Sequence, residues 1–546
     1  MSANNEEQQA ERLARSFLSG DISRRSFMRR AAGFSAVALS ASSLGAVLAA
    51  CSSTTSDEPS VTAGAVGTPT AGGTLKAALT GEPDTIDPAT STIYTGAQVY
   101  DNIFNKLIDL DPSNEFYGQL ATAWNAPDDQ TWVFDLVDTA TFHNGEKFGP
   151  DDVVYTFERI LNPKTASSYA PLYDAISKVE ATGPTQVTFH LKTPFGPFLS
   201  NLANNGEIVN QKAIESSDPS RNAIGTGPFE FVEWVKDSHL VIKRHDGYWN
   251  KQGGPYLDRV RYRPIPDDVV KLQSLQSGEI DVMDYVQPRD VAAVKADKNV
   301  VVVDVPSLAD FAYQLNTTKP PFNVKALRQA VAYAIDLEQI VKGVWLNVGV
   351  AANGPIPPTS WAYDKSIAPI KRDLAKAKAK LAEGGQPSGF TFTLTTNNIP
   401  INVQEAEVMQ AQLREAGITV KVKLVDSATL IADGNNKNFE MISFQWSGRP
   451  DPDGNTYQFL RTTPGTSFNW SGISNPQIDT LLDRTREISN QAERRKLYGE
   501  LTRILQDELP MVFIIHPVEP KAFSPKVQNY EAIPDGMMRF KDVWMR

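Results

Sequence analysis

The sequence predicts an α/β protein with more than one domain. The clearest sign is a β–α–β unit, in which strand-like segments over 389–396 and 418–425 flank a helix over 403–416. Short strand-like runs and helical patterns also follow one another along the rest of the chain. A chain of 546 residues is long enough for roughly three domains.

The first part of the chain predicts a small α+β domain that ends near residue 208. Val99, Ile103 and Leu107 recur every four residues, which predicts a helix over 96–108. Asn144 and Gly145 favour the positive φ of a tight hairpin turn. The other elements expected here are a first strand over 74–79, strands over 132–136 and 186–191, and a helix that begins at Pro150.

The second part predicts strands first and a larger α/β region after residue 310. Asn323 is expected to cap a helix that ends at Ala334, and Asp336 with Gln339 resembles a capping box for the next helix. The remaining expected elements are strands over 230–235 and 239–244, a helix over 269–276, two helices over about 476–488 and 491–508, and a strand over 511–515.

Composition excludes several classes of function. The net charge is −11 and no Lys/Arg-rich run is present, which argues against a nucleic-acid partner. The single cysteine, Cys51, allows no internal disulfide and no thiolate metal cluster. The five histidines are scattered without metal-ligand spacing. We therefore expect no cofactor and no metal site.

The N-terminus is predicted to be an export signal. Arg24 and Arg25 precede a weakly apolar segment over 31–50, which resembles a Tat signal, and the ending Leu48-Ala-Ala-Cys51 resembles the lipobox of bacterial lipoproteins. Residues 52–72 are rich in Ser, Thr, Gly and Pro and predict a flexible tether. The protein is thus expected to be lipid-anchored through Cys51 on the outer side of the cytoplasmic membrane. The alternative is that residues 31–50 span the membrane.

The stretch 439–454 is the strongest candidate for a binding site. Its first half predicts a buried strand, whereas Pro450, Pro452 and Gly454 predict a stiff loop after it. The residues at this strand end are Trp446, Ser447, Arg449, Asp451 and Asp453. Aromatic surface beside a few fixed charges suits a cleft for an organic solute. The alternative is a solvated turn whose aspartates bond only to nearby backbone.

Several spaced segments together resemble family 5 of the extracellular solute-binding proteins, the peptide- and nickel-type receptors of ABC importers. The resemblance covers essentially all of residues 73–546, and the joint order of the segments rather than any one of them carries it. They are Leu120-Ala-Thr-Ala-Trp124, Thr141-Phe-His-Asn-Gly145, Asp151-Asp-Val-Val-Tyr155, Gly225-Thr-Gly-Pro-Phe229, Gly254-Pro-Tyr-Leu-Asp258, Gly278-Glu-Ile-Asp281, Arg328-Gln-Ala-Val-Ala-Tyr-Ala-Ile-Asp336, Asn475-Pro476 and Leu509-Pro510.

The resemblance implies a two-lobed fold like that of type II periplasmic binding proteins, with an additional inserted α+β domain. Lobe closure over a ligand would exclude water and strengthen each polar contact to it. The expected divisions are a signal over 1–51, the tether over 52–72, lobe I over 73–102, 209–306 and 512–546, the inserted domain over 103–208, and lobe II over 307–511.

The resemblance also bears on the candidate site. Peptide-binding relatives carry, after a Trp-x-Gly like Trp446-Ser-Gly448, an aspartate that takes the α-ammonium of the ligand, but this chain has Arg449 there. A guanidinium binds a carboxylate or phosphate instead. Either Asp451 or Asp453 binds the ammonium group of the ligand instead, or the ligand is not a peptide with a free amine. The alternative for Arg449 is an internal salt bridge. Further cleft candidates by position are Tyr94, Asn316, Trp361 and Trp470.

The function expected from these observations is capture of a peptide-like or other small organic solute. Expected partners are that solute, an ABC permease with its ATPase subunits, and the membrane through the lipid anchor; the protein is expected to be a monomer and not an enzyme. Two alternatives stay open. One is a secreted, lipid-anchored hydrolase that uses Asp451 and Asp453, although such closely spaced acids are poorly placed to flank a scissile bond. The other is a surface receptor without transport.

Overall fold

The computed structural model describes residues 67–91, 93–462 and 468–546. The twin-arginine segment, Cys51 and most of the expected tether lie outside these residues, so the expectations for them stay predictions. Among the described residues, no helix has both the length and the apolar character that crossing a membrane requires.

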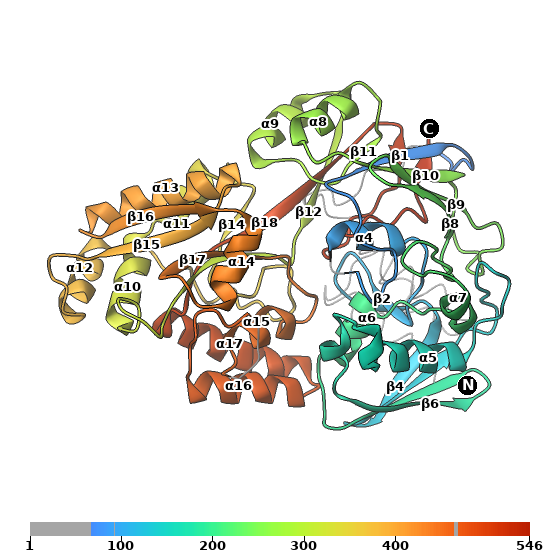
Figure 1. The fold of residues 1–546 in the computed structure, drawn as a ribbon, viewed down its shortest axis with the longest axis horizontal. Helices are drawn as coiled ribbons and strands as arrows, with labels where there is room; N and C mark the ends of the chain where they lie inside the picture. The colour runs from blue at the N-terminus through green and yellow to red at the C-terminus, as the bar shows by residue number, and fades with distance from the viewer. Residues whose placement is uncertain (1–66, 92, 463–467) are drawn as a thin grey trace, which may run out of the picture. The chain divides into compact units, whose positions relative to one another are not determined.

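The first lobe, as we call it here, is built on five strands in the order β8-β9-β10-β1-β11 (Figure 1). β1 is parallel to both of its neighbours, and the first three strands are antiparallel. Leu75, Ala77 and Leu79 of β1 alternate into a buried core, as the pattern predicts. The elements are β1 (Thr74–Leu79), α4 (Tyr94–Tyr100), β8 (Phe229–Val235), β9 (His239–Arg244), β10 (Arg259–Pro264), α8 (Asp268–Gln276), β11 (Val282–Met283) and α9 (Pro288–Ala296).

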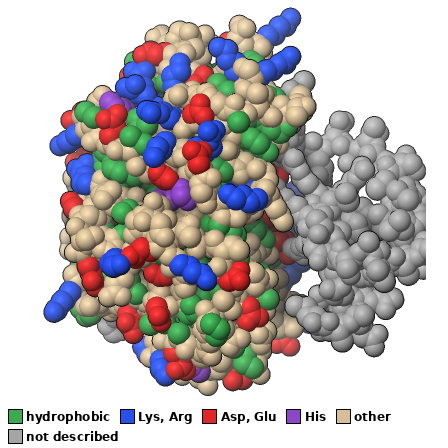
Figure 2. Space-filling view, turned by 90° about the vertical axis from the view of Figure 1, so that its right-hand side faces the viewer, with side chains coloured by type: hydrophobic (Ala, Val, Ile, Leu, Met, Phe, Trp, Pro, Cys, Tyr) green, Lys and Arg blue, Asp and Glu red, His purple; other side chains and the backbone are tan. Residues whose placement is uncertain are grey.

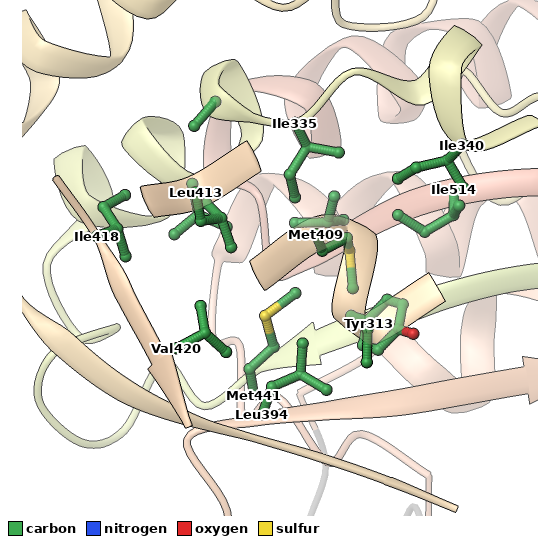
Figure 3. Packing of buried hydrophobic residues seen from close by; sticks show 14 of the residues in the cluster. Tyr313, Ile335, Ile340, Leu394, Met409, Leu413, Ile418, Val420, Met441 and Ile514 are labelled. Carbon is green, nitrogen blue, oxygen red and sulfur yellow. The ribbon is translucent and has the colours of Figure 1, made fainter. Parts of the chain in front are cut away.

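The second lobe is built on strands in the order β16-β15-β17-β13. β15 is parallel to β16 and β17, so the predicted β–α–β unit is confirmed. Met409 and Leu413 of α13 pack on Leu394 and Met441 of the sheet (Figure 3). The elements are β13 (Asp310–Leu315), α10 (Lys325–Ala334), α11 (Leu337–Gly343), β14 (Gly349–Ala351), α12 (Leu374–Glu383), β15 (Thr391–Asn397), α13 (Pro400–Glu415), β16 (Thr419–Val425), α14 (Ser427–Asn435) and β17 (Met441–Trp446).

One long strand, β18 (Met511–Phe523), belongs to both lobes. Its first residues pair with β13, and its later residues pair with β11 and with β12 (Val301–Pro306). The chain passes between the lobes a second time through residues 307–309, which join β12 to β13. Two crossover segments side by side therefore connect the lobes. The predicted boundary between 511 and 512 falls inside β18.

A separate four-stranded unit, in the order β4-β5-β7-β6, has its own core. Phe157 of α5 packs edge-on against Phe189 of β7, with ring centroids 5.0 Å apart. The predicted turn is present, and Gly145 has φ +84°. The elements are β2 (Ile108–Leu110), β3 (Phe116–Gly118), β4 (Ala121–Asp128), β5 (Thr131–Leu136), α5 (Pro150–Leu161), η1 (Pro163–Thr165), η2 (Ala170–Leu172), β6 (Ile176–Gly183), β7 (Gln186–Leu191), α6 (Phe198–Asn205) and α7 (Gln211–Ser216).

His143 fastens this turn to the first lobe. Its Nδ1 accepts from the Gly225 N–H at 3.2 Å, and its Nε2 donates to the Gly227 carbonyl at 3.0 Å. Added Cβ atoms at Gly225 and Gly227 would lie 2.2 and 2.5 Å from the carbonyl oxygen of Ile103. Two of the segments that carry the family resemblance, 141–145 and 225–229, therefore contact each other here, and close packing explains their histidine and glycines.

In the described part of the chain, three helices lie between β17 and β18, and asparagine side chains cap the N-termini of two of them. Asn475 accepts from Gln477 N–H and Ile478 N–H, and Asn490 accepts from Glu493 N–H. The elements are α15 (Asp453–Leu460), α16 (Pro476–Glu487) and α17 (Gln491–Glu508), with β19 (Val527–Gln528) and β20 (Trp544–Met545) near the C-terminus.

Two of the expected helices differ from the structure at their ends. The helix expected over 96–108 ends at Tyr100, because Asn102 instead bonds the C-terminal segment: its Nδ2 donates to Met538 O, and its Oδ1 accepts from Phe540 N–H. α10 has Val324 at its N-cap, so Asn323 lies one residue outside it.

Three further expectations are corrected. The expected capping box is only half formed. The Asp336 side chain accepts from the Gln339 N–H, but the Asp336 N–H donates to the side chain of Gln412 in α13 and not to that of Gln339. β18 continues well past residue 515 because the first lobe supplies further partner strands. The loop expected through Gly454 is shorter, since α15 begins at Asp453.

The face shown in Figure 2 mixes charges of both signs. Basic and acidic side chains are interspersed there without a large patch of either sign. Such a face offers no basic footprint for nucleic acid.

Candidate ligand-binding site

A cavity of about 120 Å³ lies where the two lobes and the four-stranded unit meet. It has room for several water molecules or a small solute. Its lining residues are Ile93, Tyr94, Ala97, Tyr100, Asp101, Lys106, Tyr169, Asn204, Asn205, Glu207, Leu308, Ser447, Gly448, Arg449, Pro450, Asp535 and Met537. A second cavity, of about 20 Å³, lies among residues that include Ala332 and Val512 and has room for about one water molecule.

The loop after β17 is held against the crossover segment. Gly448 has φ +81°, and a Cβ there would lie 1.8 Å from the carbonyl oxygen of Leu308, so only glycine allows this approach. Asn455 of α15 accepts from the Arg449 N–H at 2.8 Å and donates to Leu308 O at 3.1 Å. The backbone of Arg449 is therefore fixed relative to the crossover.

The Arg449 side chain lines the cavity, and among the described residues it has no carboxylate partner. Its Nη1 donates to the Gly448 carbonyl at 2.6 Å and to Ser447 Oγ at 3.2 Å, and its Cζ lies 4.4 Å from the centre of the Trp446 ring. No ion pair among the described residues includes Arg449. Burial lowers its pKa from the usual value. The internal salt bridge that the sequence allowed as the alternative for Arg449 is not formed with any residue that the structure describes.

Asp451 and Asp453 are both held by arginines of the C-terminal helices. Arg494 grips Asp451 with two bonds of 2.7 and 2.6 Å, and Arg486 grips Asp453 with bonds of 2.7 and 2.8 Å. The exposed fractions of the two aspartates are only 6% and 7%. Neither lines the cavity, and the two pairs anchor the loop that carries Arg449.

Three other predicted residues lie at or near the cavity. Tyr94 and Ser447 line it. Trp446 lies directly under the Arg449 guanidinium and packs on Phe459, with ring centroids 5.0 Å apart. Trp446 thus supports Arg449 without lining the cavity.

Asn316, Trp361 and Trp470 lie outside the cavity lining. Asn316 is fully buried and donates to the carbonyls of Lys437 and Phe439. Trp361 packs edge-on against Tyr498. Trp470 is 5% exposed, and its indole N–H donates to Asn435 at 2.8 Å. Ligand contact by these three stays a prediction, and in this structure each has a packing or hydrogen-bonding role.

The opposite wall of the cavity is a charged cluster that the sequence analysis missed. Lys106 Nζ lies 2.9 Å from Asp101, 3.3 Å from Asp109 and 3.8 Å from Glu207. Arg539 contacts Asp101 at 2.8 Å and Asp535 at 2.7 Å, and it lies 3.3 Å from Asp109. The one available signal was the presence of Lys106 and Asp109 in a stretch over 103–110 whose other residues, except Asn105, are apolar.

Burial controls the electrostatics of this wall. It raises the pKa of Glu207 to about 7, because desolvation and the nearby Asp101 and Asp109 outweigh the attraction of Lys106. Burial likewise raises the pKa of Asp109. Arg539 instead lowers the pKa of Asp535 against the effect of burial.

The four-stranded unit touches the second lobe beyond the cavity. The Gly196 N–H donates to the Arg486 carbonyl at 2.6 Å, and the Arg486 guanidinium lies 5.5 Å from the Phe195 ring. Arg486 also forms an ion pair with Asp453, the first residue of α15 after the loop that carries Arg449. Arg486 therefore connects the four-stranded unit to that loop. Within the described residues, no group of His, Cys, Asp and Glu is arranged to hold a metal ion.

The comparisons with known proteins agree with this fold. The family described as bacterial extracellular solute-binding proteins, family 5 Middle, matches residues 115–467. A dipeptide-binding protein of Escherichia coli (strain K12) is 28% identical over 502 residues, which cover 85% of this chain and 93% of that protein.

Two solved structures are similar over most of their length. The ABC transporter-associated periplasmic binding protein DppA from Helicobacter pylori, in complex with the peptide STSA, has a TM-score of 0.76 at 27% identity and covers 87% of this chain and 98% of its own. The binding protein AgaA in complex with agropinic acid, from A. tumefaciens R10, has a TM-score of 0.74 at 27% identity and covers 87% and 99%. These relatives are binding proteins, and the fold is the two-lobed one expected.

Proposed function

This chain belongs to family 5 of the bacterial extracellular solute-binding proteins, and on that premise we propose that it captures a peptide-like or other small organic solute between its lobes. It then delivers the solute to the permease of an ABC importer and its ATPase subunits. The supporting observation is the cavity between the lobes, into which one loop presents an arginine that no carboxylate of the described residues pairs with. Concave sites of this kind, with a few placed polar groups, suit small ligands.

Arg449 is proposed to bind the anionic group of the solute. Its backbone is fixed by Asn455, and its guanidinium rests on Trp446, so little side-chain freedom is lost on binding. A planar guanidinium forms two parallel bonds with a carboxylate or phosphate, which an ammonium cannot do. The family resemblance implies an aspartate here, so the chain favours a ligand that presents a negative charge to this loop.

Closure about the crossover segments is proposed to trap the solute. The proposed divisions are those of the sequence analysis: lobe I over 73–102, 209–306 and 512–546, the inserted domain over 103–208, and lobe II over 307–511. The supporting features are the short crossover at 307–309 and the passage of β18 beside it. Small-angle scattering should show a smaller radius of gyration with saturating solute than without it, and equal radii would contradict closure.

The protein is proposed to act as a monomer held at the outer face of the membrane by a lipid on Cys51. Replacing Cys51 with Ala should leave export intact and move the protein to the soluble fraction, whereas retention in membranes would indicate that residues 31–50 span the bilayer. Replacing both Arg24 and Arg25 with Lys should leave precursor in the cytoplasm. Normal export of that double variant would point to the Sec route.

A hydrolase based on Asp451 and Asp453 gains no support, because each carboxylate already forms two bonds with an arginine. The deciding experiment is mass spectrometry of the small molecules that co-purify with the native protein, followed by calorimetry with the identified molecule. We expect stoichiometric binding and no conversion of the bound solute. Conversion would favour an enzyme. Unchanged uptake in cells that lack the protein would favour a receptor without transport.

A further inference from the structure

The wall of the cavity opposite Arg449, called the first-lobe wall below, is formed by the first lobe together with residues 103–208 and carries more acid than base. Its ion-paired cluster contains four carboxylates and two cations, and the side chains are at most 16% exposed. The members are Asp101, Asp109, Glu207, Asp535, Lys106 and Arg539. An excess of buried carboxylate is unfavourable unless a further cation compensates it.

Among the carboxylates of this cluster that line the cavity, Glu207 has the weakest pairing with a cation. Its exposed fraction is 4%, and its closest cation, Lys106, lies 3.8 Å away and is shared with two closer aspartates. Asp535, in contrast, forms two bonds with Arg539, of 3.0 and 2.7 Å. Glu207 therefore lines the cavity with capacity for a further cationic partner.

The second-lobe wall has the opposite imbalance. Arg449 lines the same cavity and has no carboxylate partner in the part of the chain that the structure describes, since Asp451 and Asp453 are held by Arg494 and Arg486. The cavity thus has a cationic pole on one lobe and an acidic pole on the other. A ligand with both charges would compensate both poles at once and link the lobes.

From this arrangement we infer that the solute is a small zwitterion, whose cationic group binds Glu207 beside Asp101 and Asp535, and whose anionic group binds Arg449. The inference rests on the proposed function and adds the chemical class and direction of the solute. This direction is the reverse of the one that the family resemblance implies, in which an acid after Trp-x-Gly receives the ammonium. Glu207 becomes a specificity-determining residue.

Proton release gives an independent readout. Lys106, Asp101, Asp109 and the hydroxyls of Tyr100, Tyr169 and Tyr173 face Glu207. Burial and the two aspartates raise the pKa of Glu207 to about 7, against the opposing attraction of Lys106. A ligand cation beside Glu207 would lower that pKa. Binding at pH 7 should therefore release about half a proton per ligand, measured by calorimetry in buffers of different ionisation enthalpy.

Three probes test the charges of the solute. They are a complete dipeptide mixture, the same mixture N-acetylated, and the same mixture C-amidated, each added to the purified full chain. Only the unmodified mixture should raise the melting temperature, because each modification removes one charge. An equal rise with the acetylated mixture would overturn the inference, and so would the absence of any rise with the unmodified mixture.

A pair of variants tests the residue. Glu207→Gln should weaken binding of the stabilising dipeptides by about tenfold or more and abolish proton release, whereas Glu405→Gln should change neither. Glu405 is a matched control because it is a buried glutamate that bonds Trp345 outside the cavity. Unchanged binding by Glu207→Gln would overturn the inference. A solute from cell extract that binds but has no cationic group would also overturn it, yet leave the proposed function standing; failure of every extract would instead remove the proposed function.

Discussion

The two walls of the cavity are built in opposite ways. The second-lobe wall comes from one short stretch, in which a strand, a glycine and two prolines set Arg449 in place. The first-lobe wall comes from three separate parts of the sequence: Asp101 with Lys106, then Glu207, then Asp535. Local sequence thus specifies one wall, and the tertiary fold assembles the other.

The walls also satisfy their charges differently. The two aspartates near Arg449 form ion pairs with arginines of helices α16 and α17. The Arg449 guanidinium is therefore available to bind a ligand. The acids of the first lobe share two cations in one network. Substitutions in the paired acids should therefore change stability, and substitutions at the cavity surface should change binding.

The largest expected effect is on the support of the second-lobe wall. Arg494→Ala should lower the free energy of unfolding by about 3–5 kcal/mol, because it leaves the buried Asp451 without its partner. Chemical denaturation measures this. Lys295→Ala, in the exposed pair with Asp304, should cost less than about 1 kcal/mol. Equal losses from the two variants would contradict the distinction between buried support and surface pairing.

Arg449→Ala should chiefly change binding. Loss of one partner of a charged pair in a closed cavity costs about 2–5 kcal/mol, so the solute should bind roughly 30-fold more weakly or worse, at ~1.4 kcal/mol per decade. Arg449→Lys should recover part of the loss. Calorimetry and thermal melting of the ligand-free protein distinguish the roles: normal binding with a melting temperature several degrees lower would make Arg449 structural.

Two glycines that both have a positive φ angle test how closely the Arg449 loop approaches the crossover segment. Gly448→Ala and Gly145→Ala both place a Cβ at positive φ, which costs about 1–2 kcal/mol. Only at Gly448 does that Cβ also meet Leu308, so this variant should cost about 1–3 kcal/mol more. Denaturant titration of both variants gives the difference, and no difference would mean that the loop can move away freely.

The smallest expected effect lies at His143, on the first-lobe side. Burial lowers its pKa to about 4, below the usual 6.5, so the folded state disfavours the charged ring. The stability that depends on neutral His143 is complete above pH 6.5 and is lost as the pH falls toward 4. Between pH 7 and 5.5 the wild type should lose about 1 kcal/mol more than His143→Gln. Glu230 and His245 face the ring, and parallel pH profiles of the two proteins would contradict the assignment.

The sequence could predict what short-range patterns encode. The β–α–β unit, the turn at Gly145 and the strand before Arg449 follow from alternation, glycine and proline, and the structure confirms them. The early end of α4 could not be foreseen, because Asn102 bonds residues of the C-terminal segment more than 400 positions away. The pairing of Asp451 and Asp453 was equally hidden, since their arginines lie on later helices.

The position of β18 near the C-terminus has a consequence for how the chain folds. β11, β12, β13 and β14 all pair with this one strand, yet each is synthesised well before it. Until residues 511–523 emerge, those four strands keep unpaired edges that can associate with other chains. Final sheet assembly is therefore a late, long-range event, and such non-local pairing is slow. The four strands therefore need protection from association until residues 511–523 are free to pair with them.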